Sequence, residues 1–279
     1  MNRIGIFKET LQIVSDGKYV VNGKNVVLKH SVSELEQAVF FPEKNVKEII
    51  CEHMKLRREP CVDEMSIMVT NKDAFSAALD MSRYTSFGEV AVLNFANPVN
   101  SGGGVKYGAM AQEEDLCRKS TLFVSLESES VTEFYRFHKE ECDCFSSHSI
   151  IVSPNVEVFR GYNNDLLPYT FSVAVLSCAA PIFDGIKKKS YSHDEYTSIL
   201  YERIMGILSV CEKMGYTKLV LGAWGCGSFS NDPKLMAKLF YKALCQFNGA
   251  FKEIEFAVFG GAENFGSFHE VMILKKIDD

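Results

Sequence analysis

The stretch "VAVLNFANPVNSGGGVKYGAMAQEEDL", residues 90–116, contains three patterns that together indicate the class of fold. Residues 90–96 are almost all apolar, which is typical of a buried strand. Three consecutive glycines follow at Gly102–Gly104, and a helical pattern begins at Gln112 with carboxylates in its first turn. A buried strand that leads through a loop into a helix is the repeating unit of an α/β protein.

The same alternation continues along most of the chain. Short apolar runs bounded by turn residues predict strands, and apolar residues spaced three or four apart predict helices. We expect an α/β fold with helices on both faces of one sheet. The predicted strands are 65–70, 90–96, 149–160, 170–180, 218–224 and 253–260, and the predicted helices are 74–82, 111–126, 134–145, 194–214 and 233–248.

The first 60 residues have a different character. They read as a helix from Ile4 to Val14, a hairpin turning at Asn22-Gly23, and a polar helix over about 46–57. The boundary is expected near Glu59-Pro60, so the sequence predicts an N-terminal segment of residues 1–60 and a larger domain of residues 61–279.

Composition excludes several classes of protein. The chain has 279 residues and a net charge of -6, which argues against the broad basic surface that nonspecific nucleic-acid binding needs. No run reaches the roughly 20 apolar residues of a membrane span, so we expect a cytoplasmic or nuclear protein without membrane contact. Nine cysteines without a CxxC pair indicate reduced thiols.

Two glycine-bearing loops, 102–104 and 225–229, follow predicted strands. In an α/β sheet, ligands bind beyond the carboxyl ends of the strands. Glycines let backbone N–H groups approach a ligand closely, so each loop is a candidate anion site. Taken alone, either loop is better explained as a tight turn, and neither matches a Walker P-loop or a GxGxxG motif.

The carboxylates that follow the first glycine loop are candidates for acid–base chemistry. Gln112, Glu113 and Glu114 are predicted in the first helical turn, where the helix dipole also favours negative charge. Glu114 could instead pair with Arg118, four residues later. The residues alone leave both interpretations open.

Two other groups of side chains could carry chemistry. Cys226 lies between two glycines and could be a nucleophile near a helix N-terminus. His138, Cys142, Cys144 and His148 are zinc-ligand types at an unusual spacing. The sequence favours neither, since no histidine lies near Cys226 and the HxxxCxCxxxH spacing matches no common zinc motif.

Taken together, these segments resemble one enzyme family. Residues 94–116 resemble the signature of poly(ADP-ribose) glycohydrolases, in which a triple glycine is followed by QEE. SPNVEVFR (153–160) and LGAWGCGSFSNDP (221–233) resemble the microbial-type, bacterial-like members. The match implies a macrodomain-like mixed sheet flanked by helices, with a catalytic domain after an N-terminal accessory segment. Many bacterial members have NPGGG, whereas this chain has Asn100-Ser101 before the glycines, which should loosen the loop.

The resemblance also implies an activity. Family members hydrolyse the ribose–ribose O-glycosidic bonds of poly(ADP-ribose) and release ADP-ribose, without a metal or redox cofactor. We therefore expect poly(ADP-ribose) or ADP-ribosylated proteins as substrate, and a monomer. The alternatives are a hydrolase of mono-ADP-ribosylated acceptors, a macrodomain that binds ADP-ribose without cleaving it, and a cysteine-dependent hydrolase.

Residue roles follow from the same resemblance. Glu114 corresponds to the acid/base, and a neighbouring glutamate should raise its pKa by like-charge repulsion. Glu113 and Asn97 would contact the distal ribose, and Gln112 would help to fix the substrate. The other matched positions are Gly102, Gly103 and Gly104 in the loop over the ribose, Gly225, Cys226, Gly227 and Ser228 in the diphosphate loop, Phe229 and Phe259 near the ribose, and Asn71 and Asp73 as adenine contacts or helix caps.

Overall fold

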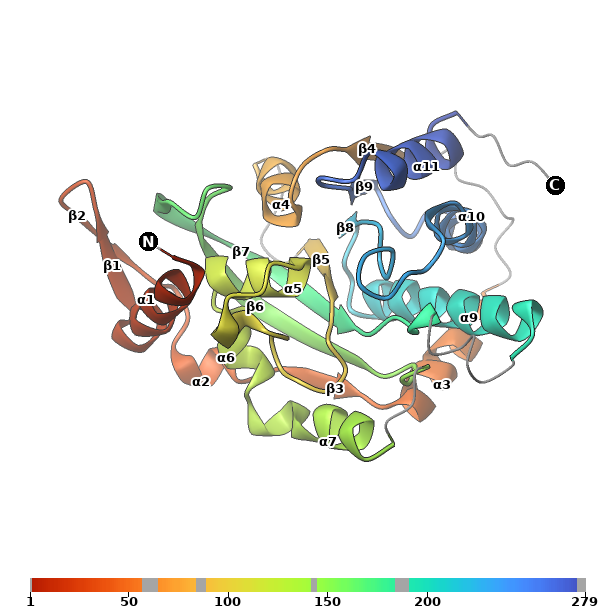
Figure 1. Cartoon of the computed structure of the whole chain (residues 1–279), viewed down its shortest axis with the longest axis horizontal. Helices are drawn as coiled ribbons and strands as arrows, with labels where there is room; N and C mark the ends of the chain where they lie inside the picture. The colour runs from red at the N-terminus through yellow and green to blue at the C-terminus, as the bar shows by residue number, and fades with distance from the viewer. Residues whose placement is uncertain (1, 57–64, 84–88, 142–144, 184–190, 275–279) are drawn as a thin grey trace.

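The computed structural model describes residues 2–56, 65–83, 89–141, 145–183 and 191–274 (Figure 1). Its centre is a seven-stranded sheet with the order β3-β6-β7-β5-β8-β9-β4. The predicted α/β class is confirmed, and the sheet is mixed. The strands are β3 (Val39–Phe41), β4 (Ser66–Thr70), β5 (Val90–Phe95), β6 (Ile150–Arg160), β7 (Leu166–Cys178), β8 (Lys218–Leu221) and β9 (Glu253–Ala257).

Strand direction brings the functional loops together. β7, β5, β8, β9 and β4 run parallel, whereas β6 pairs antiparallel with both β7 and β3. Parallel neighbours end at the same edge of a sheet, so the segments that follow β4, β5, β8 and β9 meet there. Both glycine loops belong to this set.

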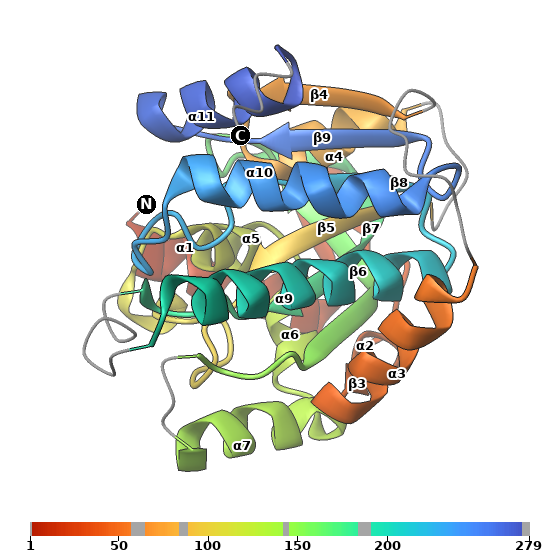
Figure 2. The same cartoon turned by 90° about the vertical axis from the view of Figure 1, so that its right-hand side faces the viewer.

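Helices cover both faces of the sheet (Figure 2). Side chains of β5 alternate between the two hydrophobic cores: Ala91 and Leu93 pack with α3, α9, α10 and α11, whereas Val90 and Val92 pack with α1, α4, α5, α6 and α7. A strand covered on both faces is apolar at consecutive positions. The helices are α1 (Arg3–Asp16), α3 (Glu43–Met54), α4 (Ala74–Ser82), α5 (Gln112–Lys119), α6 (Leu122–Leu126), α7 (Thr132–Glu141), α9 (His193–Lys213), α10 (Pro233–Leu244) and α11 (Ala262–Met272).

The N-terminal segment contains the helix and hairpin that its sequence predicts. β1 (Lys18–Val21) and β2 (Lys24–Val27) pair around the Asn22-Gly23 turn, and the short α2 (Val32–Leu35) follows. β3 then joins the central sheet through β6, a pairing that the sequence did not indicate. The proposed boundary at Glu59-Pro60 lies outside the described residues, so the division there stays a prediction.

One predicted helix is wrong in its extent. Residues 111–126 form two helices, because the backbone is extended at Ser120 and pairs there with Val158. The next N–H, of Thr121, donates to Glu157 O at 3.0 Å. Bridging to β6 therefore overrides the local helical pattern, and α5 ends one turn after its carboxylates.

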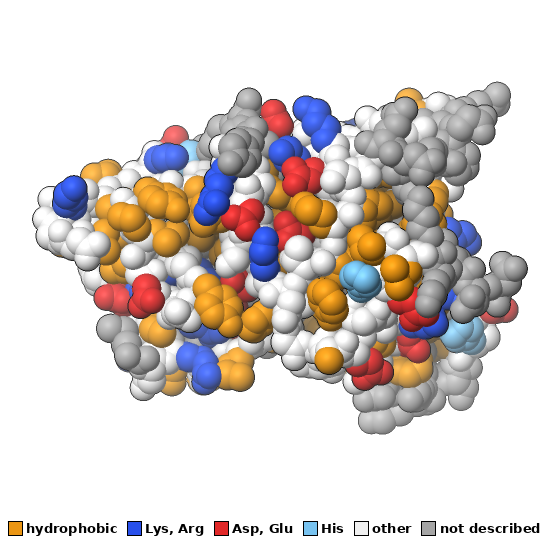
Figure 3. Space-filling view, turned by 90° about the horizontal axis from the view of Figure 1, so that it is seen from above, with side chains coloured by type: hydrophobic (Ala, Val, Ile, Leu, Met, Phe, Trp, Pro, Cys, Tyr) orange, Lys and Arg blue, Asp and Glu red, His pale blue; other side chains and the backbone are white. Residues whose placement is uncertain are grey.

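The hydropathy of the helices and the distribution of charged side chains describe the surface of the protein. Across the part of the chain that the structure describes, no helix is both long and apolar enough to cross a membrane. Acidic and basic side chains are interspersed on the face shown in Figure 3, with no continuous basic patch. This face offers no broad electropositive surface.

Candidate active site

A cavity of about 940 Å³ lies where the parallel strands end. Its wall combines the segments after β4, β5, β8 and β9 with the start of α5 and the β6–β7 turn. The structure thus brings most of the predicted residues to one place. Those in the wall are Asp73, Asn97, Gln112, Glu113, Glu114, Gly225, Gly227, Ser228, Phe229 and Phe259; Asn71, Gly102, Gly103, Gly104 and Cys226 lie outside it.

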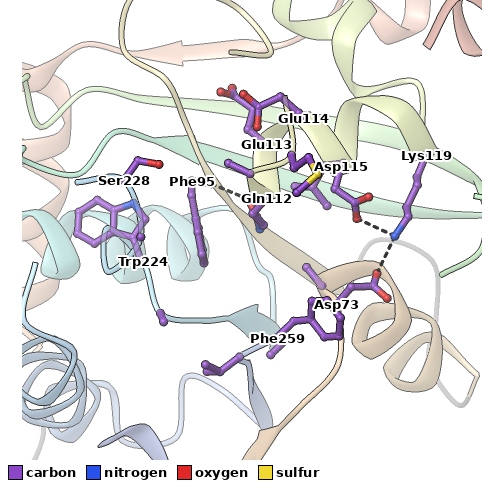
Figure 4. Close-up of a pocket in the computed structure, with 18 of the residues that line it drawn as sticks. Asp73, Phe95, Gln112, Glu113, Glu114, Asp115, Lys119, Trp224, Ser228 and Phe259 are labelled. Atoms are coloured by element: carbon purple, nitrogen blue, oxygen red, sulfur yellow. Dashed lines mark hydrogen bonds and ion pairs between the residues drawn. The ribbon is translucent and has the colours of Figure 1, made fainter. Parts of the chain in front are cut away.

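Gln112 fastens the start of α5 to β5 (Figure 4). Its Oε1 accepts the N–H of Phe95 at 2.9 Å, and its Nε2 donates to Leu93 O at 2.7 Å. Both polar ends of the amide are therefore used by the strand backbone. This arrangement fixes the two glutamates that follow relative to the end of the strand.

Glu113 is buried, with 2% of its surface exposed. Its Oε1 accepts from Asn94 Nδ2 at 3.2 Å, and its Oε2 accepts the N–H of Asn97 at 2.8 Å. Burial raises the pKa of Glu113 from its ordinary 4.5 to about 8, and the charge of Glu114 contributes less. Desolvation, and not the like-charge repulsion that the sequence led us to expect between the two glutamates, is therefore the main cause of the raised pKa of Glu113.

Glu114 has one satisfied oxygen and one that is not. Oε1 accepts the N–H of Gly104 at 2.8 Å, whereas Oε2 is buried without a hydrogen-bond partner. The pair with Arg118 that the spacing allowed is absent among the described residues; Arg118 donates to Ala109 O at 2.6 Å and lies 3.9 Å from Asp115. This oxygen belongs to a residue of the cavity wall and is available to a ligand.

The triple glycine lies directly against these carboxylates. Gly102 and Gly103 have φ values of 63° and 56°, which favour glycine. A Cβ on Gly103 would overlap Glu114 Oε1 and lie 3.2 Å from Glu113 Oε2. The absence of side chains here allows the loop backbone to approach both glutamates.

The second glycine loop presents backbone donors to the cavity. Asn231 Nδ2 donates to Gly225 O at 2.9 Å and to Pro181 O at 3.0 Å, which fixes the loop before α10. In the described part of the chain, the N–H groups of Gly225, Gly227 and Ser228 donate to no protein acceptor. Free backbone N–H groups in such a turn can bind an anion.

The two alternative centres gain no support. Burial raises the pKa of Cys226 to about 12, so its thiol stays protonated and is a poor nucleophile. Of the four zinc-ligand candidates, Cys142 and Cys144 lie outside the described residues. His138 Nε2 accepts the N–H of Ser147 at 3.0 Å, and His148 Nε2 lies 3.5 Å from Glu202 Oε2.

The far end of the cavity contains residues that the sequence did not indicate. Lys119 is 2% exposed and lies 2.6 Å from Asp115 and 3.4 Å from Asp73 (Figure 4). Tyr162, from the β6–β7 turn, packs edge-on against Phe259 with ring centroids 5.6 Å apart. Arg3 also reaches the wall from α1. Lys119 follows Asp115 by four residues, a spacing that a helical pattern could have indicated. Tyr162 and Arg3 are distant in sequence from the rest of the wall, so no local pattern identifies them.

The two residues considered for adenine differ in position. Asp73 lines the cavity and also caps α4, since its Oδ1 accepts the N–H of Ser76 at 3.2 Å. Asn71 lies outside the wall, and its Oδ1 accepts the N–H of Gly260 at 3.2 Å. Only Asp73 therefore has the position of a ligand contact.

Fold and site together define an α/β protein with a cleft at the strand ends, which is lined by a glycine loop with free backbone N–H groups and by two buried carboxyls. Comparison with known proteins makes the assignment specific. The model of the microbial-type PARG catalytic domain matches residues 7–161. The chain belongs to this family of poly(ADP-ribose) glycohydrolases, as its sequence motifs indicate.

Solved structures agree with this assignment. Poly(ADP-ribose) glycohydrolase from Thermomonospora curvata, bound to the inhibitor ADP-HPD, has 32% identity and a TM-score of 0.86, covering 96% of this chain and 98% of that chain. The Deinococcus radiodurans enzyme in complex with ADP-ribose has 33% identity and a TM-score of 0.78, covering 87% and 98%. No curated protein matches the sequence.

Proposed function

We propose that this chain hydrolyses the ribose–ribose O-glycosidic bonds of poly(ADP-ribose), releases ADP-ribose, and uses Glu114 as the acid/base. The observation that carries the proposal is the unpaired, buried Oε2 of Glu114 in the wall of the cavity. Buried carboxylate oxygens usually have hydrogen-bond partners, and one left free in the wall of a cavity is available to a ligand. The similar Deinococcus radiodurans enzyme binds ADP-ribose, which supports this class of ligand.

The reaction needs one group that gives and then takes a proton. Glu114 in its acid form donates a proton to the oxygen that links the two riboses, and the bond from that oxygen to the anomeric carbon breaks with its electron pair on oxygen. The Glu114 carboxylate then accepts a proton from the water that attacks the anomeric carbon. The products are ADP-ribose and a polymer shorter by one unit.

The neighbouring groups support each state of Glu114. The Gly104 N–H, 2.8 Å from Oε1, stabilises the carboxylate that forms in the first step. With a pKa of about 8, Glu113 is mostly protonated at neutral pH, so it adds little negative charge and can donate to a ribose hydroxyl. The free N–H groups of Gly225, Gly227 and Ser228 would hold the diphosphate.

The isosteric variant Glu114→Gln tests the proposal. It should bind ADP-ribose as the parent protein does, yet release at least about 100-fold less ADP-ribose from labelled, automodified polymer, because the amide cannot exchange the proton. Glu52→Gln removes an exposed carboxylate elsewhere and should keep full activity. Polymer hydrolysis by Glu114→Gln at the parental rate would refute the assignment.

Product lengths separate the rival functions in the same assay. A hydrolase of mono-ADP-ribosylated acceptors would remove only the protein-linked unit and leave polymers of unchanged length. A binding module would retain ADP-ribose without releasing any. Progressive shortening with accumulation of free ADP-ribose supports the proposed activity.

A further inference from the structure

A second cavity, of about 830 Å³, lies behind the triple-glycine loop. Asn97 lines both cavities, and Gly103 and Gly104 line only the second. Because Gly103 borders this cavity and also lies against Glu114, a single thickness of backbone separates the proposed acid/base from it. Nothing in the proposed chemistry above uses this space.

Positive charge prevails in the wall of the second cavity. Lys106, Arg136 and Lys139 line it, against one carboxylate, Glu127. Lys106 Nζ lies 3.6 Å from Glu127 Oε2, and both side chains are about half exposed. Arg136 pairs with Glu133, which lies outside the wall. Exposed ion pairs contribute little, so these cations can exchange their partners for phosphate oxygens.

The exposed aromatic ring of Tyr107 lines the same cavity. Tyr107, three residues after the last glycine of the loop, is 85% exposed. A flat ring with two open faces can stack a nucleobase. Deeper in the wall, Tyr135 Oη is buried without a hydrogen-bond partner, which leaves a polar group for a ligand hydroxyl or phosphate.

We propose that the second cavity binds the ADP-ribose unit on the leaving-group side of the scissile bond, with its diphosphate on Lys106, Arg136 and Lys139 and its adenine on Tyr107. This inference rests on the proposed function. The oxygen that Glu114 protonates belongs to that leaving unit, and Asn97, which lines both cavities, is where the bond between the two units would pass from one cavity to the other. The unit carries a base and two phosphate charges, which match an aromatic ring and an excess of cations.

Two substrates test the subsite directly. The first is the ADP-ribose dimer, and the second is ADP-ribose with a small alcohol at the same anomeric carbon, which lacks the leaving-side nucleotide. Tyr107→Ala, and separately the double variant Arg136→Ala with Lys139→Ala, should raise the KM for the dimer about tenfold, the order expected for loss of base stacking or phosphate contacts. The kcat for the dimer and both constants for the small conjugate should change less than about twofold.

Matched variants control for surface effects. Tyr169→Ala removes another exposed tyrosine. Arg83→Ala removes an exposed arginine that pairs with Asp80, three residues earlier, just as Arg136 pairs with Glu133. Neither should change the KM for the dimer. Tyr107→Phe keeps the ring and should keep the parental KM, and added salt should raise the dimer KM less in the double variant than in the parent.

The outcomes distinguish failure of the proposed function from failure of the proposed subsite. A parent protein that cleaves neither substrate contradicts the proposed function itself. A parent that cleaves both, with a dimer KM unaffected by Tyr107→Ala and by the double variant, contradicts the subsite alone. Equal losses on both substrates would also overturn it, since they would place these residues in support of the catalytic cavity.

Discussion

The N–H of Gly104 lies 2.8 Å from Oε1 of Glu114, so the glycine loop and the first turn of α5 act as one unit. Glu113 completes it from the other side by accepting the N–H of Asn97 at the start of the same loop. The two carboxyls therefore set the position of the eight-residue segment 97–104, which borders the second cavity. A small displacement of this loop should affect the chemistry more than it affects the fold.

Gly103→Ala should lower kcat for polymer hydrolysis about 100-fold, because a Cβ would overlap Glu114 Oε1 and move the carboxyl of the proposed acid/base away from its present position. Kinetics on poly(ADP-ribose) would measure the change. Gly249→Ala is the control, since Gly249 also has a positive φ but an added Cβ would meet nothing within 4 Å. Equal activity of the two variants would show that the close approach at Gly103 is unimportant.

Glu113→Gln should alter how stability depends on pH. Between about pH 4.5 and pH 8 the folded protein holds a proton on Glu113 that the unfolded chain has released. The contribution of Glu113 to the free energy of unfolding therefore falls as the pH rises through this range. The variant lacks this contribution, so its stability relative to the parent should rise with pH by up to about 1.4 kcal/mol per pH unit, and level off above pH 8.

Urea unfolding of the parent and Glu113→Gln at pH 5, 6, 7 and 8 measures this difference. Glu52→Gln, which removes an exposed carboxyl, serves as the reference for general charge effects. A difference between Glu113→Gln and the parent that stays constant across the four pH values would show that Glu113 titrates normally.

Local patterns predicted the parts of this site that are local in sequence. The apolar run of β5, the glycines after it and the carboxylates that begin α5 follow one another within 27 residues, and each is specified by residue type. β3 is only three residues long and depends on pairing with β6, more than 100 residues later. Arg3 and Tyr162 lie just outside the two ends of the family match, residues 7–161, and both line the cavity. Because they are far from its other residues in sequence, no short stretch of sequence could reveal them.

Lys119→Met should destabilise the protein by roughly 3 kcal/mol, since it leaves Asp115 and Asp73 without the cation that both contact in a buried setting. Thermal or urea unfolding would measure the loss. Adding Asp115→Asn should recover part of it by removing one of the two carboxylates that have lost Lys119. Strictly additive losses in the double variant would show that Lys119 and Asp115 do not interact energetically.

Gly225→Ala should weaken ADP-ribose binding at least about tenfold, because the loop that offers free N–H groups has no room for a side chain at this position. Gly225 has a φ of 75°, and a Cβ there would overlap Asn231 Nδ2 and lie 2.7 Å from Ala180 Cβ. Asn231 would have to give up its bonds to Gly225 O and Pro181 O, which turns the loop N–H groups away from a bound diphosphate. Calorimetric titration with ADP-ribose gives the Kd, and Gly215→Ala, at a φ of 79° with nothing within 4 Å of the added Cβ, controls for backbone strain. Parental affinity in Gly225→Ala would mean that the diphosphate is held by some other part of the cleft.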